Sequence, residues 1–231
     1  MTGSPLRSLT IAVDGFGAVS ALLLAPSQMR ACFVFAHGAG AGMTHGFMTG
    51  VAESLAAHGV ATLRFQFPYM EKGSKRPDSP ALAQAAVRAA VAEAARLYPD
   101  LPLIAGGKSF GGRMTSQAQS VRPLPRVAGL AFFGFPLHPA GKPSVSRAEH
   151  LDAIAVPMLF LQGTRDKLAD IALLEPVVRR LGPLATLHAI DQADHGFHVP
   201  ARSGRNDQAV ITELTAAFAA WLDGVISARE S

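Results

Sequence analysis

The sequence predicts an α/β fold with a mostly parallel, doubly wound sheet and helices on both of its faces. Short apolar runs rich in β-branched and aromatic residues alternate with longer helical segments, which is typical of strands joined by crossover helices. Three runs, at residues 32–36, 103–105 and 158–161, are almost continuously apolar, as expected of strands that helices cover on both faces. With 49% hydrophobic and 16% charged residues and no evident linker, residues 1–231 are expected to form a single domain.

The expected elements follow one another in a regular order. The runs at residues 9–13 and 21–24 flank a glycine-containing turn, which predicts an antiparallel hairpin at the N-terminal edge of the sheet. The helix expected at residues 81–97 is rich in alanine, with one proline at its start and another just beyond its end. The other expected strands are residues 32–36, 61–67, 103–105, 127–135, 158–161 and 186–190, and the other expected helices are residues 47–58, 112–120, 171–181 and 207–226.

Charge and cysteine content limit the classes of partner. The formal net charge of +4 comes from scattered Lys and Arg residues, with only short groups such as residues 72–76, which indicates a mildly basic surface and no nucleic-acid partner. Residues 1–15 lack a signal-peptide pattern, and by this reading no apolar segment approaches membrane-spanning length, so we expect a cytoplasmic protein without a membrane partner. Cys32, the only cysteine, lies in an apolar run and is expected to be a buried, inert thiol.

Residues 105–112, AGGKSFGG, contain two competing motifs. A phosphate-binding loop would need a glycine five positions before Gly107, but Pro102 stands there, with no N–H to donate and a fixed φ. The alternative is G-x-S-x-G, in which flanking glycines relieve crowding around a serine on a tight strand-to-helix turn. We therefore interpret Ser109 as the serine of a nucleophile elbow and rank nucleotide hydrolysis last.

Several polar residues follow the expected strands, at the sheet edge where sites form in open parallel sheets. Ser109, Asp166 and His195 occur in the chain order Ser, Asp, His. A serine hydroxyl is a poor nucleophile unless a neighbouring base takes its proton, and an imidazole titrates near neutrality. A carboxylate can fix the imidazole tautomer. The candidate catalytic residues are therefore Ser109 as nucleophile, His195 as base and Asp166 as the acid that orients it.

Six segments along the chain carry a family resemblance: HGAGAG from His37, LRFQFPYM from Leu63, GGKSFGG from Gly106, FFGFPLHPAGKP from Phe132, LQGTRD from Leu161 and ADHGF from Ala193. In this order they resemble the α/β-hydrolase superfamily, and more narrowly the small dienelactone-hydrolase-related group that includes the KANL3/Tex30-type hydrolase-like domains. The resemblance covers nearly the whole chain and implies an α/β-hydrolase fold and a serine hydrolase of small carboxylic esters, thioesters or lactones that needs no cofactor. Dienelactone hydrolases of this group often use cysteine as nucleophile, whereas this chain has serine.

Two backbone N–H groups are expected to form an oxyanion hole. One belongs to Phe110, at the start of the helix after the elbow, and the other to Ala39, in the loop that His37 begins. His37 itself either braces that loop by hydrogen bonds or faces the substrate. Residues 135–151 are too few for a large lid, so we expect a minimal cap and an open site.

Further residues near the strand ends are candidates for a substrate pocket. Lys108 could attract an anionic substrate, or it could simply face the surface. Core packing is the alternative for the aromatic candidates. The set comprises Tyr69, Lys108, Phe135, His138 and Phe197, together with His37.

Alternatives remain open at each level. Asp170 competes with Asp166, and His198 competes with His195, although the DHGF context favours His195. A metal site is poorly supported, because there is no HExxH motif, no cysteine pair and no evident third ligand beside the two histidines. The same residues could serve a serine peptidase or acyltransferase, or the chain could be a non-catalytic interaction scaffold. We expect a small-molecule acyl substrate and a monomer or homodimer.

Overall fold

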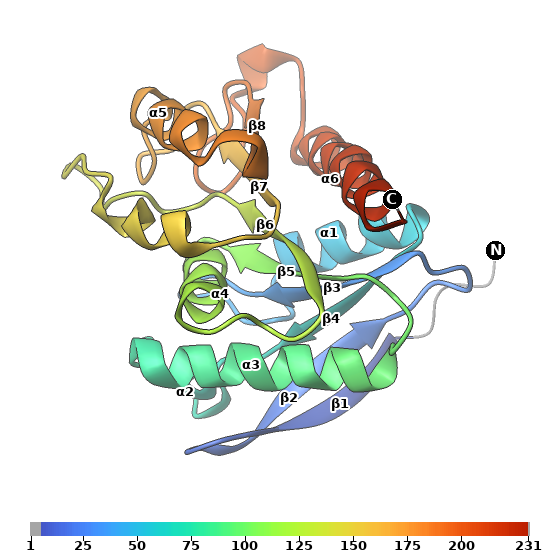
Figure 1. The fold of residues 1–231 in the computed structure, drawn as a ribbon. Helices are drawn as coiled ribbons and strands as arrows, with labels where there is room; N and C mark the ends of the chain where they lie inside the picture. The colour runs from blue at the N-terminus through green and yellow to red at the C-terminus, as the bar shows by residue number, and fades with distance from the viewer. Residues whose placement is uncertain (1–5, 231) are drawn as a thin grey trace.

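Eight strands form one continuous sheet in the computed structural model, which describes residues 6–230 (Figure 1). The strand order is β1-β2-β4-β3-β5-β6-β7-β8; β3 to β8 pair in parallel, while β2 pairs antiparallel with both β1 and β4. The expected domain of residues 1–231 extends at both ends beyond the described residues. The strands are β1 (Leu6–Val13), β2 (Gly17–Leu24), β3 (Ala31–Ala36), β4 (Val60–Phe65), β5 (Leu103–Lys108), β6 (Val127–Phe133), β7 (Met158–Gly163) and β8 (Ala185–Ile190).

The architecture confirms the predicted mostly parallel sheet with an antiparallel N-terminal edge. In the β1–β2 hairpin Val13 lies opposite Gly17, and Gly15, with φ of +77°, makes the turn. The helices are α1 (Gly46–Ala57), α2 (Pro68–Glu71), α3 (Pro80–Leu97), α4 (Phe110–Val121), α5 (Ile171–Leu181) and α6 (Asp207–Glu230), and the 3₁₀ segments are η1 (Ser146–Ala153), η2 (Gly182–Leu184) and η3 (Ala201–Ser203).

The hydrophobic core forms two layers, one on each face of the sheet. Because side chains alternate along a strand, Phe33 and Phe35 of β3 belong to one layer and Cys32 and Val34 to the other. Helices α1 and α6 cover the first layer, whereas α3, α4 and α5 cover the second (Figure 1). Burial raises the pKa of the Cys32 thiol to about 12, which agrees with the inert thiol that we predicted.

Helix α6 corrects the expectation that no apolar segment approaches membrane-spanning length. By length and composition Asp207–Arg229 could cross a membrane, with a mean hydropathy of 1.5 in its most apolar window. Its large apolar residues Val210, Leu214, Phe218 and Leu222 recur at one-turn spacing and are buried against the sheet, which is the pattern of an amphipathic helix that packs on a core by one face. The cytoplasmic location remains a prediction.

Strand β5 extends beyond its expected end at Ala105, through Gly106 and Gly107 to Lys108. A Cβ on Gly106 would lie 1.9 Å from the carbonyl oxygen of Ala131 in β6, so only glycine fits this close pairing of two strands. The glycine run therefore belongs to a strand rather than a turn, and it carries the chain directly to Ser109.

Strands β4 and β6 end earlier than the apolar runs predicted at residues 61–67 and 127–135. Strand β4 ends at Phe65 because Pro68 soon starts the short helix α2, which the sequence analysis missed. Strand β6 ends at Phe133 because Gly134, with φ of +70°, turns the chain away. Both turns lie at the same edge of the sheet as Ser109.

Candidate active site

Ser109 occupies a strained turn between β5 and α4, with φ of +49° and ψ of −113°. Gly107 and Gly111 make the turn possible: a Cβ on either residue would lie 2.4 or 2.5 Å, respectively, from the carbonyl oxygen of Ala36. The backbone N–H of Ser109 donates to the carbonyl oxygen of Phe133 at 3.1 Å. The G-x-S-x-G spacing thus places a half-buried serine side chain at the carboxyl edge of the sheet.

The structure brings the three candidate catalytic residues into one hydrogen-bonded chain. His195 Nε2 lies 2.8 Å from Ser109 Oγ, and His195 Nδ1 lies 2.6 Å from Asp166 Oδ2. Asp166 is buried, and it also accepts from Gln162 Nε2 at 2.5 Å and from the Leu168 N–H at 2.7 Å. An ionised carboxylate only accepts, so we assign the proton to Nδ1, which leaves the Nε2 lone pair facing the serine hydroxyl.

The rival acid and the rival base have other partners. Asp170 caps α5 by accepting from the Ala172 N–H at 2.9 Å. His198 pairs through Nδ1 with Asp207 Oδ2 at 2.6 Å and is largely exposed. Neither residue takes the place of Asp166 or His195 in the contacts with Ser109, although His198 lines the cavity beside the serine.

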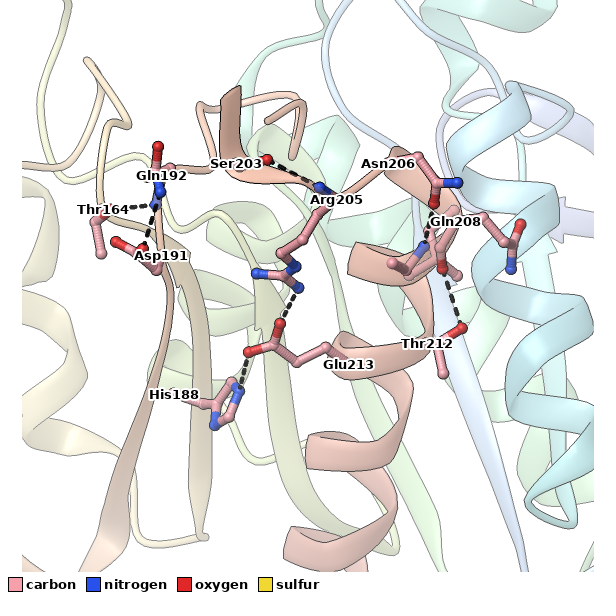
Figure 2. A network of polar contacts seen from close by, with 12 residues as sticks. Thr164, His188, Asp191, Gln192, Ser203, Arg205, Asn206, Gln208, Thr212 and Glu213 are labelled. Atoms are coloured by element: carbon pink, nitrogen blue, oxygen red, sulfur yellow. Dashed lines mark hydrogen bonds and ion pairs between the residues drawn. The ribbon is translucent and has the colours of Figure 1, made fainter. Parts of the chain in front are cut away.

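The segment that carries His195 connects β8 to α6 and is anchored at both ends (Figure 2). Near its start, the Gln192 N–H donates to Thr164 Oγ1 at 2.8 Å. Near its end, Arg205 binds Glu213, whose second carboxylate oxygen lies 3.2 Å from His188 Nε2. These contacts fix the segment to β8, α6 and the loop after β7, on either side of the histidine.

Phe110 follows Ser109 in the chain, and Ala39 lines the same cavity as Ser109. Phe110 is the first residue of α4, where helix N–H groups have no intrahelical acceptor. Ala39 is exposed in the loop after β3, next to Gly38, at which a Cβ would come within 3.7 Å of Ser109 Cβ. The arrangement is compatible with two N–H donors beside the serine.

His37 and Tyr69 correct part of the expected pocket, because both are buried and hold the Ala39 loop instead. His37 Nδ1 donates to the Gly38 carbonyl at 2.8 Å, while Nε2 accepts from the Phe67 N–H at 3.0 Å. The Tyr69 hydroxyl accepts from the Gly40 N–H at 3.3 Å. Their side chains point into the protein because the hydrogen-bonding groups of the loop lie there.

Phe135 and His138 are also wrong as pocket residues. Phe135 is fully buried and packs edge-on against Phe132 and Phe160, with ring centroids 5.3 and 5.8 Å away. His138 donates from Nδ1 to its neighbour's carbonyl and accepts at Nε2 from the Asp170 N–H at 3.2 Å. Both residues lie near a strand end, but the Phe135 side chain packs in the core and the His138 ring holds a loop through its hydrogen bonds.

A cavity of about 590 Å³ opens beside Ser109 and His195. Of the expected pocket residues, Phe197 and Lys108 line it, and Lys108 is half-buried rather than facing the surface. Between β6 and β7 the described chain contains only η1, so no multi-helix cap covers the serine. The sequence analysis missed the apolar wall from α1 and α6, which consists of Phe47, Met48 and Ile211.

The described residues hold no group of three or more His, Cys, Asp or Glu side chains placed to bind a metal ion. His195 and His198, the two histidines considered for such a site, each have a carboxylate partner. The His195–Asp166 and His198–Asp207 pairs do not combine into one group of metal ligands.

We expect stability to fall on acidification below pH 6.5. Burial lowers the pKa of His37 from 6.5 to about 4, so between these values the unfolded chain binds a proton that the folded protein does not, and falling pH favours unfolding. The expected loss from this residue is on the order of 3 kcal/mol by pH 4. Urea midpoints against pH measure it, and His37→Gln should flatten the curve.

The flattening should be partial, because burial also lowers the pKa of His150 to about 4. A curve for His37→Gln as steep as that of the wild type would contradict the prediction.

This chain matches a protein-family model and resembles several solved structures. A family model described as an alpha/beta hydrolase domain matches residues 29–223. A dienelactone hydrolase from Anabaena variabilis ATCC 29413 is 21% identical over 96% of this chain and 98% of its own, with a TM-score of 0.78. An α/β serine hydrolase without a lid from Xanthomonas campestris is 20% identical over 96% of each chain, with a TM-score of 0.74. An esterase from Pyrococcus furiosus is 16% identical over 95% of this chain and 92% of its own, with a TM-score of 0.75. At these identities the likeness shows a shared fold.

Proposed function

Because the chain belongs to the α/β-hydrolase family and has its fold, we propose that it is a serine hydrolase that cleaves small carboxylic esters, thioesters or lactones. The observation that carries the proposal is the hydrogen-bonded chain from Ser109 through His195 to Asp166 beside an open cavity. This arrangement matches the requirements for a serine nucleophile, a base and an orienting acid.

The proposed first step is acylation of Ser109. Ser109 Oγ attacks the carbonyl carbon while its proton passes to His195 Nε2, and buried Asp166 stabilises the imidazolium. The N–H groups of Ala39 and Phe110 bind the oxyanion. When the tetrahedral intermediate collapses, the bond to the leaving oxygen or sulfur breaks, and His195 returns the proton to the leaving group.

In the second step, water replaces the leaving group. His195 takes a proton from water as the water oxygen attacks the acyl carbonyl, and the proton then returns to Ser109 Oγ as the acid product departs. Every proton is accounted for by this one imidazole, so the reaction as proposed needs no metal or cofactor.

The cavity favours substrates with an apolar portion. Phe47, Met48, Phe197 and Ile211 line it, while His198 and Asp207 add an exposed polar pair. A few polar groups with a mostly apolar wall is the usual composition of a small-molecule site. We propose that the apolar portion of a small acyl substrate lies between α1 and α6.

The test is labelling with a fluorophosphonate, with the adduct located by mass spectrometry. The chain offers a matched pair of serines, since Ser116 Oγ also lies 2.8 Å from a histidine nitrogen, that of His150, but is buried. We expect an adduct on Ser109 alone. We expect the adduct to be lost in His195→Ala and retained in His150→Ala.

Other outcomes would favour the alternatives. No adduct and no esterase activity in a folded wild type would favour the interaction scaffold. Faster turnover of an amide than of the matched ester would favour a peptidase, and transfer to an added alcohol in preference to water would favour an acyltransferase.

A further inference from the structure

Lys108 directly precedes Ser109, yet its ammonium reaches the segment that carries the candidate base. Lys108 Nζ donates to the backbone carbonyl oxygen of His195. The last residue of β5 is therefore joined by a charge-assisted hydrogen bond to the main chain of the residue whose ring faces Ser109.

Two aromatic rings hold the ammonium from another side. Lys108 Nζ lies 5.1 Å from the ring centroid of Phe197 and 5.9 Å from that of Phe47, within the range of cation–π attraction. The two rings stack on each other with centroids 5.4 Å apart and planes at 7°. The ammonium thus touches α1 and the His195 segment together.

Neighbouring glycines leave the space that the lysine fills. A Cβ on Gly134, which follows β6, would lie 3.0 Å from Lys108 Nζ and 3.5 Å from His195 Nδ1 and Cε1. A Cβ on Gly38 would lie 3.5 Å from Lys108 Cγ. The lysine side chain and the imidazole therefore share one closely packed space.

We propose that Lys108 is a positioning residue, which fastens the backbone of His195 to the strand that carries Ser109 and so holds the imidazole at hydrogen-bond distance from the hydroxyl. The inference rests on the proposed function. The tight turn that contains His195 includes Phe197 at φ of +67°, and the lysine contacts both residues. A displacement of the ring by about 1 Å would lower the rate of the chemical step by up to about 100-fold.

The surroundings of the ammonium argue against the alternative of a binding site for an anionic substrate. The ammonium of Lys108 already contacts the His195 carbonyl and two aromatic rings. The carboxylates of Asp166 and Asp194 lie near enough to raise the pKa of this lysine. Burial outweighs them and lowers the pKa to about 8. A substrate carboxylate would have to displace these partners.

The experiment compares Lys108→Met, which keeps an unbranched stem without the donor, with Lys167→Met, an exposed lysine in the loop after β7. Readouts are kcat and KM on a neutral activated ester and the downfield proton resonance of His195 Nδ1–H. For Lys108→Met we expect kcat to fall about 10-fold to 100-fold with KM nearly unchanged, and the resonance to broaden or shift. Lys108→Arg should restore part of kcat, and Lys167→Met should match the wild type.

A kcat and resonance in Lys108→Met equal to those of the wild type would overturn the proposal. So would an increase in KM confined to carboxylate-bearing esters with kcat unchanged, which would make the lysine an anion-binding group. If Lys108→Met does not fold, Lys108→Gln, which keeps a polar but uncharged and shorter side chain, should give the same loss of kcat. If the wild type has no hydrolase activity, the proposed function fails, and the resonance still tests the lysine contact.

Discussion

Ser109→Ala is expected to lower kcat on an activated ester by about 10⁴-fold or more, with little change in stability. The serine oxygen forms the covalent bond in the proposed mechanism, and without it only binding and oxyanion stabilisation remain. Its side chain lines the open cavity and is not part of the core, so the smaller alanine leaves no core void. Steady-state kinetics and thermal unfolding of the purified variant measure both effects.

Ser116→Ala is the matched control for this variant. Ser116 Oγ donates to the Arg113 carbonyl at 2.9 Å and contacts His150, so its removal should cost about 1 kcal/mol of stability but leave kcat at the wild-type level. Wild-type kcat in Ser109→Ala, or a large loss in Ser116→Ala alone, would reject Ser109 as the nucleophile.

Asp166→Asn is expected to lower kcat at neutral pH by about 10⁴-fold. The oxygen of the asparagine amide would keep accepting from the Leu168 N–H, which directs its NH₂ group toward His195 Nδ1. Nδ1 would then have to accept, and the ring proton would move to Nε2, where it blocks proton transfer from Ser109. Gln162 Nε2 donates to Asp166 Oδ2, the oxygen that also faces His195, and would lose this acceptor in the variant.

Asp170→Asn provides the comparison, because asparagine caps a helix about as well as aspartate and should preserve both α5 and kcat. Rate measurements from pH 6 to pH 10 should show kcat of Asp166→Asn rising at high pH, because hydroxide can then replace the imidazole as the base that takes the serine proton. A large loss in Asp170→Asn with normal activity in Asp166→Asn would exchange the roles assigned to the two carboxylates.

The strand-end residues were the predictable part of the site. Ser109, Asp166 and His195 each follow an apolar run, and parallel strands bring their carboxyl ends to one edge of the sheet. Chain order, the G-x-S-x-G motif and the DHGF context together predicted that these three side chains would meet, while Asp170 and His198 stayed open as rivals. The alternation of apolar runs and helical segments predicted the sheet, the hairpin and, among the described residues, helices α1, α3, α4, α5 and α6, but neither α2 nor the 3₁₀ segments.

The cavity wall was not predictable for a physical reason. Phe47 and Ile211 lie on α1 and α6, and they come together only because both helices pack on the same face of the sheet. In the sequence they are indistinguishable from core residues. Conversely, Tyr69 and Phe135 lie near strand ends, but strand ends also carry side chains that turn inward, and neighbouring hydrogen bonds and ring contacts decided their direction.

The strand order also bears on how the protein acquires its site during folding. β5 lies inside the sheet, whereas the segments that carry Asp166 and His195 follow β7 and β8, the last two strands of the parallel side. The serine turn can therefore form in an intermediate that still lacks its partners. Such an intermediate would have a folded sheet centre and no base, because β8 must dock before His195 reaches Ser109. We therefore expect hydrolytic activity, after dilution from denaturant, to return later than secondary structure, when the sheet is completed at its C-terminal edge.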